Sequence, residues 1–311
     1  MKILLLGANG QVGFELARAL APLGELHVAT REGVPPSHFA ARYKVDLADA
    51  ASLHAALREL EPELVVNAAA YTAVDRAEDE PELADRINHQ ALQLLGAWAK
   101  STQALIVHYS TDYVFDGQGQ RPYREDDATG PLGTYGRSKL AGEKALRASG
   151  CAHLILRTAW VFAARGHNFL RTMLRLASER DSLRVVGDQR GAPTSARLIA
   201  DATAQLLARW SVFDAERQRA TLGTYHLCAA GECSWHEFAR AIFAAAHGAS
   251  LLRRVPDVAA IGTADYPTKA RRPSYSVLDS AKIRATFGIH LPAWRDGLDA
   301  VIAELAVQRQ G

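Results

Sequence analysis

Short apolar runs alternate with segments of helical periodicity along the first half of this chain. Apolar residues spaced about three or four positions apart predict a helix, whereas an unbroken run of about four to eight apolar residues predicts a buried strand. Strands are expected at residues 3–6, 26–29, 64–67, 104–110 and 154–158. Helices are expected between them at residues 12–23, 51–60, 81–101 and 135–149. This alternation predicts an α/β fold, a Rossmann-type doubly wound parallel sheet with helices on both faces.

The alternation loosens after residue 158. Helices are expected at residues 169–180 and 197–210, and strands at residues 183–186 and 223–229. A further helix is expected after Ser234, because Glu237 follows three residues later in the spacing of a capping box. No repeat or low-complexity linker separates the two halves. We therefore expect the later elements to interleave with the sheet and to add a smaller C-terminal lobe.

The composition is that of an ordinary globular protein, with 311 residues of which 48% are hydrophobic and 23% charged. A net charge of +2 without a long basic run gives no reason to expect a nucleic-acid partner. No run of about 18 apolar residues is present, so no membrane span or membrane partner is expected. Cys151, Cys228 and Cys233 are too few for a disulfide framework, which indicates a reducing compartment, and we expect the cytoplasm.

Three glycines, Gly7, Gly10 and Gly13, follow the first predicted strand and open the first predicted helix. Such a loop allows a tight turn, close approach of the backbone to a pyrophosphate, and close packing of the helix on the strand. The free N–H groups of the helix, from Gln11 and Val12 onward, then face the phosphates. The loop predicts a dinucleotide site, and a purely structural turn is the alternative.

The end of the second strand predicts which dinucleotide is bound. An acid there would favour NAD by binding the adenine ribose, but the chain has Thr30 followed by the cation Arg31. This pair suits the 2′-phosphate of NADPH, unless Arg31 points into solvent. Asp46 and Leu47 could bracket the adenine, although Asp46 could instead cap a helix.

Small side chains at Ala68, Ala69 and Ala70 follow another strand and would let a cofactor lie against the backbone. Tight packing of a helix on the sheet is the alternative reason for them. The expected domain boundaries are 1–162 for an NADP-binding Rossmann domain, with return segments at about 195–230, and 163–194 with 231–311 for a substrate-binding lobe.

Tyr135 and Lys139 lie four residues apart in a predicted helix and so share one face. An isolated tyrosine, with a pKa near ~10, is a poor proton donor at neutral pH. A lysine cation about 4 Å away could lower that pKa by about 3 units, to near 7. The chain has 29 arginines and seven lysines, yet it has lysine here, the one of the two that can release its proton. The pair predicts a proton-transfer site.

Thr111 supplies a second hydroxyl at the end of a predicted strand, on the same edge of the sheet. A ketone oxygen could accept a hydrogen bond from Thr111 and a proton from Tyr135 as hydride arrives. A turn or helix cap is the alternative role for Thr111, and Ser110 is expected to point into the core. Asp112 would bond a sugar hydroxyl or order the glycine-rich loop at 117–133.

The glycine loop and the set of Thr111, Tyr135 and Lys139 resemble the extended short-chain dehydrogenase/reductase family. The runs that narrow the resemblance to reductases of nucleotide-linked ketosugars are NAAAYTAVD at 67–75, YSTDYVF at 109–115, YGRSKLAGE at 135–143, RTAWVF at 157–162, DQRGAPT at 188–194, and Arg272-Pro273 followed by Leu278-Asp279. The resemblance spans nearly the whole chain. It implies that NAD(P)H reduces the 4-keto group of dTDP-4-dehydro-L-rhamnose, the last step of dTDP-L-rhamnose synthesis.

The resemblance also implies a role for each candidate residue. The implied roles are cofactor contacts for Gly10, Gln11, Val12, Ala68, Ala69, Ala70 and Tyr109, sugar contacts for Thr111, Asp112 and Trp160, proton donation by Tyr135, and support of that donor by Lys139. Tyr135 and Lys139 are also expected to contact the cofactor, with Lys139 holding the nicotinamide ribose. Trp160 could instead be an ordinary core residue. Arg272 is a candidate for holding the diphosphate. Thr30 departs from relatives that carry an acid there, which favours NADPH and leaves NADH open.

Some members of the family are described with magnesium between two subunits, and Glu15 stands at a matching position. Glu15 alone cannot form a metal site, and an acid near a helix N-terminus is stabilising in any case. Mg²⁺ and a homodimer are therefore left open, and no residue is assigned as a metal ligand. The eleven histidines show no spacing typical of a zinc site.

Two other functions are open at this point. A 4-ketoreductase for a different nucleotide-activated deoxysugar would carry the same catalytic residues. A non-catalytic NADP-binding regulatory subunit, which one animal relative of the family is, would need the fold but not the chemistry. The intact set of Thr111, Tyr135 and Lys139 argues for an enzyme.

Overall fold

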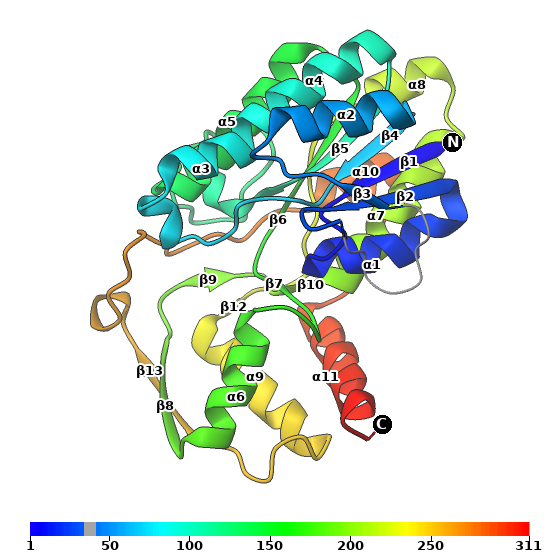
Figure 1. Cartoon of the computed structure of the whole chain (residues 1–311). Coiled ribbons are helices and arrows are strands. Elements are labelled where there is room, and N and C mark those ends of the chain that lie inside the picture. The colour runs from blue at the N-terminus through cyan, green and yellow to red at the C-terminus, as the bar shows by residue number, and fades with distance from the viewer. Residues whose placement is uncertain (34–41, 311) are drawn as a thin grey trace.

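A seven-stranded parallel sheet forms the centre of the computed structural model, which describes residues 1–33 and 42–310 (Figure 1). The strands run in the order β11-β6-β5-β4-β1-β2-β3, and every neighbouring pair is parallel. Their bounds are Lys2–Leu6 (β1), Glu25–Thr30 (β2), Arg42–Lys44 (β3), Leu64–Asn67 (β4), Leu105–Thr111 (β5), His153–Thr158 (β6) and Gly223–His226 (β11). The predicted Rossmann-type sheet is confirmed. The strand order reverses between β1 and β4, which is where such sheets bind ligands.

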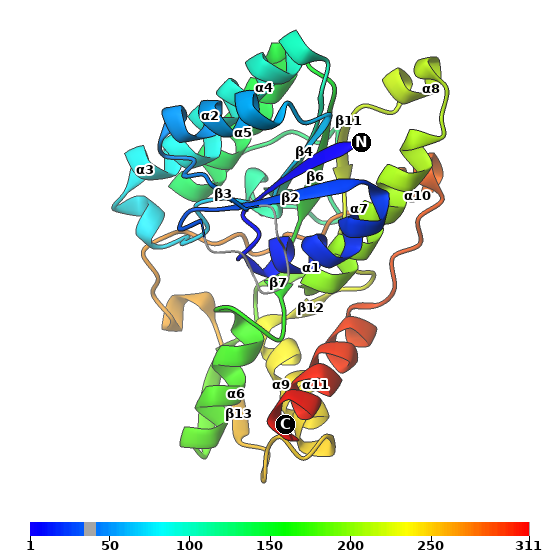
Figure 2. The same cartoon turned by 45° about the vertical axis from the view of Figure 1, so that its right-hand side comes forward.

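Strand β1 shows why these strands are unbroken apolar runs in the sequence. Ile3 and Leu5 point into the core on one face of the sheet, whereas Leu4 and Leu6 point into the core on the other. The helices on the first face are α1 (Gln11–Leu20), α7 (Ala196–Ser211) and α10 (Ala281–Phe287), and those on the second are α2 (Ala50–Leu60), α4 (Ala91–Thr102) and α5 (Thr134–Ser149) (Figure 2). Both faces of the sheet are therefore covered, as in doubly wound folds.

The helix predicted at residues 81–101 contains a π-helical turn. Helix α3 (Pro81–Asp85) leads into this turn at Arg86–Gln90, and α4 follows. Within the turn, the Asn88 side chain accepts the N–H of Tyr71 at 2.9 Å and donates to its carbonyl oxygen at 3.0 Å and to Ser138 Oγ at 3.0 Å. A Cβ at Gly142 of α5 would collide with the Asn88 carbonyl oxygen, so α5 packs directly on the turn.

A smaller lobe lies beyond the C-terminal ends of the strands, below the sheet in Figure 1. Its elements are the helices α6 (Phe169–Glu179), α9 (Trp235–Gly248) and α11 (Trp294–Gln310) and the parallel pair of β8 (Ser182–Val186) and β13 (Asp257–Ile261). These elements share a core of their own. Ser234 and Glu237 form the predicted capping box at the start of α9.

Several elements were not predicted from the sequence. They are β3, β13, α10, α11, α8 (Ala215–Ala220), and the two-residue strands β7 (Val161–Phe162), β9 (Arg190–Gly191), β10 (Thr194–Ser195) and β12 (Cys233–Ser234). After β13 the chain returns from the lobe to the sheet, where Ile283 and Phe287 of α10 pack in the core. The sequence predicts all of residues 231–311 in the lobe, but α10, within that range, packs on the sheet instead.

Of the helices in the described part of the chain, none is long and apolar enough to cross a membrane.

Candidate active site

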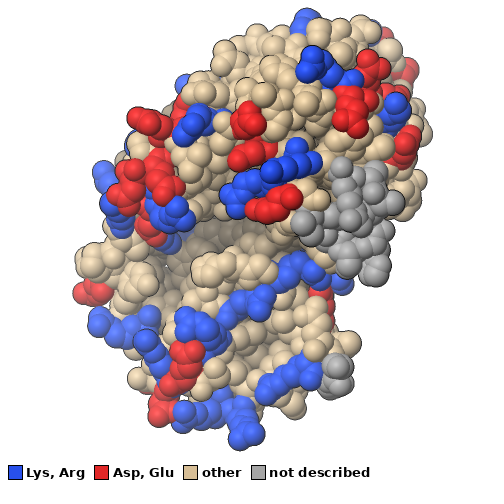
Figure 3. Space-filling view, in the orientation of Figure 1, with Lys and Arg blue, Asp and Glu red and all other residues tan. Residues whose placement is uncertain are grey.

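A cavity of about 640 Å³ lies between the C-terminal edge of the sheet and the lobe, visible as the hollow across the middle of Figure 3. The predicted site residues that line it are Gly7, Gly10, Gln11, Val12, Thr30, Arg31, Asp46, Leu47, Ala68, Ala69, Ala70, Tyr109, Thr111, Asp112, Tyr135, Lys139, Trp160 and Arg272. Segments that are far apart in the sequence thus meet at one place. The candidate cofactor, proton-transfer and substrate residues share this cavity.

The glycine loop lies at the sheet end of the cavity. Gly7 has a φ of +80°, which glycine adopts without strain, and a Cβ there would lie 2.6 Å from the Ala69 nitrogen. Gly13 does not line the cavity but lets α1 approach the loop, because a Cβ there would collide with the Gly7 carbonyl oxygen. Gly10 precedes α1, and within the described residues no side chain caps this end of the helix. The first N–H groups of α1 are therefore available to an anion.

Thr30, Arg31 and Glu32 lie at the rim of the cavity, at the end of β2. Thr30 is buried, whereas Arg31 is exposed and its Nε lies 3.0 Å from Glu32 Oε1. The hydrogen bond from Arg31 lowers the pKa of the Glu32 carboxyl. Glu32 was not among the predicted site residues. It places an acid beside the cation that suits a 2′-phosphate.

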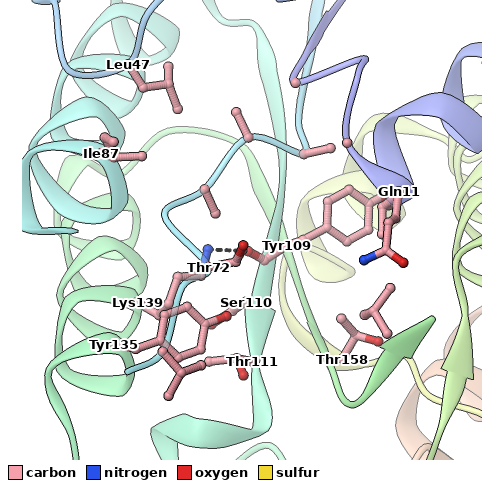
Figure 4. Close-up of a pocket in the computed structure, with 18 of the residues that line it drawn as sticks. Gln11, Leu47, Thr72, Ile87, Tyr109, Ser110, Thr111, Tyr135, Lys139 and Thr158 are labelled. Carbon is pink, nitrogen blue, oxygen red and sulfur yellow. Dashed lines mark hydrogen bonds between the residues drawn. The ribbon is translucent and has the colours of Figure 1, made fainter. Parts of the chain in front are cut away.

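Asp46 and Leu47 line the cavity near the start of α2, and Leu47 lies at one end of it in Figure 4. Asp46 Oδ1 accepts the N–H of Ala48 at 2.9 Å. The cap of α2 is Asp49, whose carboxylate accepts the N–H of Ala51 at 3.0 Å. Asp46 therefore shapes the turn that places Leu47 in the cavity wall and does not cap the helix.

Tyr135 and Lys139 lie on neighbouring turns of α5 and face β5 (Figure 4). Lys139 Nζ donates to the Tyr109 carbonyl oxygen at 2.6 Å and lies 3.1 Å from His108 Nε2. Burial lowers the pKa of Lys139 to about 7. Burial also raises the pKa of Tyr135 to about 12, although a hydrogen bond with Thr111 opposes this rise.

The structure contradicts the expectation that Lys139 brings the pKa of Tyr135 down to near 7. Both groups are enclosed, so burial disfavours the phenolate and the ammonium alike. The amine is bonded to β5, and its lowered pKa weakens the positive charge on which the expectation depended. Tyr135 accordingly keeps its proton across the physiological pH range, and its donation depends on a positive charge nearby, which Lys139 supplies when it is protonated.

Thr111 and Asp112 extend this group at the end of β5. Thr111 Oγ1 donates to Asp112 Oδ1 at 2.9 Å and accepts the N–H of Tyr113 at 3.2 Å, so Thr111 also fills the alternative role of a cap. Asp112 is buried, and burial raises the pKa of its carboxyl to about 6. Ser110 is buried as predicted, yet it also lines the cavity. A hydroxyl, a phenol and a carboxyl thus meet in one part of the cavity wall.

Trp160 forms part of the wall on the lobe side. Its φ of +47° lies in the left-handed region, which is strained for a residue with a side chain. Its ring stacks on that of Trp235, with centroids 3.4 Å apart and planes 4° apart. Gly191 makes room for this arrangement, because a Cβ there would collide with the Trp160 indole. Trp160 is half-buried and lines the cavity with Trp235 and Phe169, so it is not an ordinary core residue.

Arg272 reaches the cavity from the segment that follows β13. Its Nη2 lies 2.7 Å from Asp75 Oδ2, and the N–H of Ala270 donates to Asp75 Oδ1 at 3.1 Å. Asp75 thereby fixes both the side chain of Arg272 and the backbone that carries it. The role of Arg272 in holding a diphosphate stays a prediction.

Comparison with known proteins agrees with this geometry. The family model described as RmlD substrate binding domain matches residues 1–307. The chain belongs to the RmlD substrate-binding domain family. Relatives include the dTDP-4-dehydrorhamnose reductase of Burkholderia thailandensis, 49% identical over 99% of this chain and 100% of the relative. That of Salmonella typhimurium is 43% identical over 98% of each.

Solved structures of dTDP-4-dehydrorhamnose reductases share the fold of this RmlD-family chain. The one from Clostridium acetobutylicum has a TM-score of 0.86 and 34% identity, covering 98% of this chain and 99% of that chain. The one from Bacillus anthracis, in complex with NADP, has a TM-score of 0.85 and 30% identity, covering 97% and 99%. The resemblance to extended short-chain dehydrogenases/reductases that the motifs indicated is confirmed.

The residues around Glu15 do not fit the magnesium position described for some members of the family. Glu15 is buried, and its Oε2 lies 3.6 Å from Arg18 Nε and 3.4 Å from Arg197 Nε. The two guanidinium groups beside this carboxylate disfavour a cation there, and each also pairs with a second acid, Arg18 with Asp201 and Arg197 with Glu304. Across residues 1–33 and 42–310, no three His, Cys, Asp or Glu side chains gather into a group that could hold a metal ion.

Three features of this RmlD-family site were missed from the sequence. The ring of His108 contacts the amine of Lys139, and the ring of Trp235 stacks on that of Trp160. Glu143 of α5 forms a buried pair with Arg157 of β6, with Arg157 Nη2 2.8 Å from Glu143 Oε2. A polar residue inside the apolar run of β5 was a signal that could have pointed to His108. Arg157 is likewise a charged residue inside the apolar run of β6. The stacking of Trp235 on Trp160 joins segments that are far apart in the sequence, which no local pattern reveals.

Proposed function

We propose that this protein reduces the 4-keto group of dTDP-4-dehydro-L-rhamnose to a hydroxyl, the last step in making dTDP-L-rhamnose, a precursor of cell-surface polysaccharides. The observation that carries the proposal is that Thr111, Tyr135 and Lys139 share one cavity with the glycine loop. The family match over residues 1–307 supports the dTDP-linked substrate. So do relatives named dTDP-4-dehydrorhamnose reductase at 38% to 49% identity.

The cofactor we propose is NADPH, which supplies a hydride when bound. The glycine loop and the start of α1 fit its pyrophosphate, because Gly7 keeps the loop free of a side chain beside Ala69. Arg31 fits a 2′-phosphate, and Glu32 beside it fits a ribose hydroxyl. The exposed cation favours NADPH, and the acid leaves NADH as the second choice.

Proton transfer uses side chains of the protein itself. Tyr135 donates its phenolic proton to the ketone oxygen as that oxygen gains negative charge, and the raised pKa keeps the phenol protonated until then. The Thr111 hydroxyl, now bonded to Asp112, can turn to donate a hydrogen bond to the same oxygen. Lys139, which lies one turn along α5 from Tyr135, would hold the nicotinamide ribose of a bound cofactor and, when charged, stabilises the phenolate left behind. The phenolate then regains a proton from solvent, which closes the proton balance.

The nucleotide sugar would lie against the lobe. Trp160 offers a flat ring for the hexose, and Asp112 offers a carboxyl for a sugar hydroxyl. Arg272, anchored by Asp75, would hold the diphosphate. Figure 3 shows Lys and Arg side chains along the edge of the lobe that borders the hollow, which favours an anionic substrate. Association into a homodimer stays a prediction.

Turnover with a panel of nucleotide-linked 4-ketosugars tests the proposal. The purified protein should oxidise NADPH with dTDP-4-dehydro-L-rhamnose, and the product should be dTDP-L-rhamnose. A higher kcat/KM with a UDP- or GDP-linked ketosugar would favour a 4-ketoreductase for another deoxysugar. Binding of NADPH without oxidation by any of these ketosugars would favour a regulatory subunit.

A further inference from the structure

Buried side chains behind Lys139 form a chain of hydrogen bonds that reaches from the catalytic amine to the end of β4. The exposed fractions are 2% for Lys139, 0% for His108 and 1% for Asn67. His108 Nε2 lies 3.1 Å from Lys139 Nζ, and His108 Nδ1 lies 3.2 Å from Asn67 Nδ2. His108 itself does not line the cavity, so any effect on the reaction passes through Lys139.

The backbone at Ala69 fixes the direction of these hydrogen bonds. The N–H of Ala69 donates to Asn67 Oδ1 at 3.1 Å, so the NH₂ group of Asn67 is the end that faces His108. An amide NH₂ group can only donate, so His108 Nδ1 accepts. A neutral imidazole whose Nδ1 accepts carries its proton on Nε2, and here Nε2 faces Lys139.

The Nε2–H of His108 then has Lys139 Nζ as its acceptor. An ammonium has no lone pair, whereas a neutral amine has one. The N–H groups of the amine still donate, one of them to the Tyr109 carbonyl oxygen at 2.6 Å. The contacts around Nζ therefore match an uncharged lysine. Burial lowers the pKa of Lys139 and of His108, which agrees with this state.

We propose that His108 is a positioning residue that carries its proton on Nε2, holds the Lys139 amine uncharged, and so sets the pH at which this lysine gains its charge. To accept a hydrogen bond from a charged Lys139, His108 would have to move its proton to Nδ1, which would then face the NH₂ group of Asn67 without an acceptor. The inference deepens the proposed function and rests on it, because the charge of Lys139 supports proton donation by Tyr135.

Other charged groups near Lys139 act in the opposite direction or are already paired. Glu143, one turn further along α5, favours the charged form of Lys139. Its carboxylate is held by Arg157 of β6 at 2.8 Å and by Arg147 of α5 at 2.6 Å. From β5, the groups that contact Nζ are the carbonyl of Tyr109 and the ring of His108. The uncharged state of Lys139 thus depends on burial and on His108.

The substitution Asn67→Asp reverses the direction of the hydrogen bonds from residue 67 through His108 to Lys139 and changes the side-chain shape little. The new carboxylate can accept from the N–H of Ala69 and from a proton on His108 Nδ1, so that Nε2 becomes an acceptor for a charged Lys139. The pKa of Lys139 should rise by about one pH unit. NMR of labelled lysine across a pH series measures this, because the chain has only seven lysines and Lys139→Arg identifies the signal.

A carboxylate would raise the pKa of Lys139 by its charge alone, so a second background separates the two causes. In His108→Phe, a ring of similar shape remains but has no nitrogen that could pass on the reversal. Adding Asn67→Asp there should shift the pKa of Lys139 by about half as much or less, as a double-mutant cycle measures. An equal shift in both backgrounds would overturn the proposal.

The tautomer of His108 in the unaltered protein gives a direct readout that needs no variant to fold. Nitrogen-15 NMR at neutral pH should show an uncharged ring with its proton on Nε2, and a proton on Nδ1 or a charged ring would overturn the proposal. The NMR readouts do not depend on turnover. If the protein showed the expected tautomer but failed to oxidise NADPH with any of the ketosugars tested, the assignment of His108 would be supported and the proposed function contradicted.

Discussion

Tyr135, Lys139 and Asp112 share one part of the cavity wall, and burial shifts the pKa of each in the direction that favours the uncharged side chain. The pKa is raised to about 12 for Tyr135 and about 6 for Asp112, and lowered to about 7 for Lys139. Within the physiological pH range, the carboxyl and the amine therefore change charge, whereas the proton donor does not. The sequence predicted these residues but not the directions, because burial depends on packing between elements.

Removing the phenolic hydroxyl tests the proton donor. Tyr135→Phe should lower kcat by about 10²- to 10⁴-fold, the usual contribution of a general acid, and leave the Kd for NADPH unchanged. The matched control is Tyr113→Phe, because its ring lies 5.8 Å from that of Tyr135 and also lines the cavity. The control should keep most of kcat. A loss of NADPH affinity as large as the loss of kcat would contradict the assigned role.

The pH dependence of kcat/KM should be bell-shaped and narrow. A carboxyl with a raised pKa is charged only above it, so activity should rise through about pH 6 as Asp112 ionises. A lysine with a lowered pKa is charged only below it, so activity should fall through about pH 7 as Lys139 loses its proton. Asp112→Asn should remove the acid limb and keep the basic one. A rate that stays constant up to about pH 10 would rule out Lys139 as the titrating group.

Arg31 should favour binding of NADPH, and Glu32 should favour binding of NADH. Arg31→Ala should raise the KM for NADPH about tenfold, the lower end for a hydrogen bond to a charged group, and change that for NADH little. Glu32→Gln should instead weaken NADH and spare NADPH. Steady-state kinetics with both cofactors measure these changes. If Arg31→Ala changed the two KM values equally, a 2′-phosphate contact would be refuted.

Among the elements, those buried on both faces follow most directly from the sequence. Strand β4 has the predicted bounds, and β1, β2, β5 and β6 begin and end within one residue of them. The missed strand β13 is mostly exposed and has no buried apolar run; its backbone pairing with β8 holds it in place. The π-helical turn was missed for another reason. It depends on Asn88 bonding to Tyr71 and on the close approach of Gly142, which no local pattern records.

The close packing of α1 on the glycine loop can be tested by a substitution that adds a single methyl group at Gly13. Gly13→Ala would place a Cβ against the Gly7 carbonyl oxygen, so unfolding should become easier by about 1–3 kcal/mol, the usual cost of overpacking, and NADPH affinity should fall. The matched control is Gly248→Ala in α9, where a Cβ meets nothing within 4 Å. The control should leave both quantities unchanged or slightly raise stability. Equal thermal stability of the two variants would contradict this account of the loop.

Across the whole molecule, the site forms where the sheet and the lobe meet. Composition and element order predicted the sheet, the lobe and the sheet edge at which the cavity opens. They did not predict that α10 returns to the sheet, or that Trp235 of the lobe stacks on Trp160. Those contacts join segments about 50 residues apart or more, so they follow from the fold and not from any local run.

Transfer of deuterium tests the central claim most directly, because it follows the hydride itself. The protein would be incubated with dTDP-4-dehydro-L-rhamnose and NADPH deuterated at the nicotinamide C4 position. Since the glycine loop and Tyr135 line the same cavity, we expect dTDP-L-rhamnose that carries deuterium on C4 of the sugar, as read by NMR. Tyr135→Phe should form little of it. If the unaltered protein left the label in the cofactor and the ketosugar unreduced, the account would be contradicted.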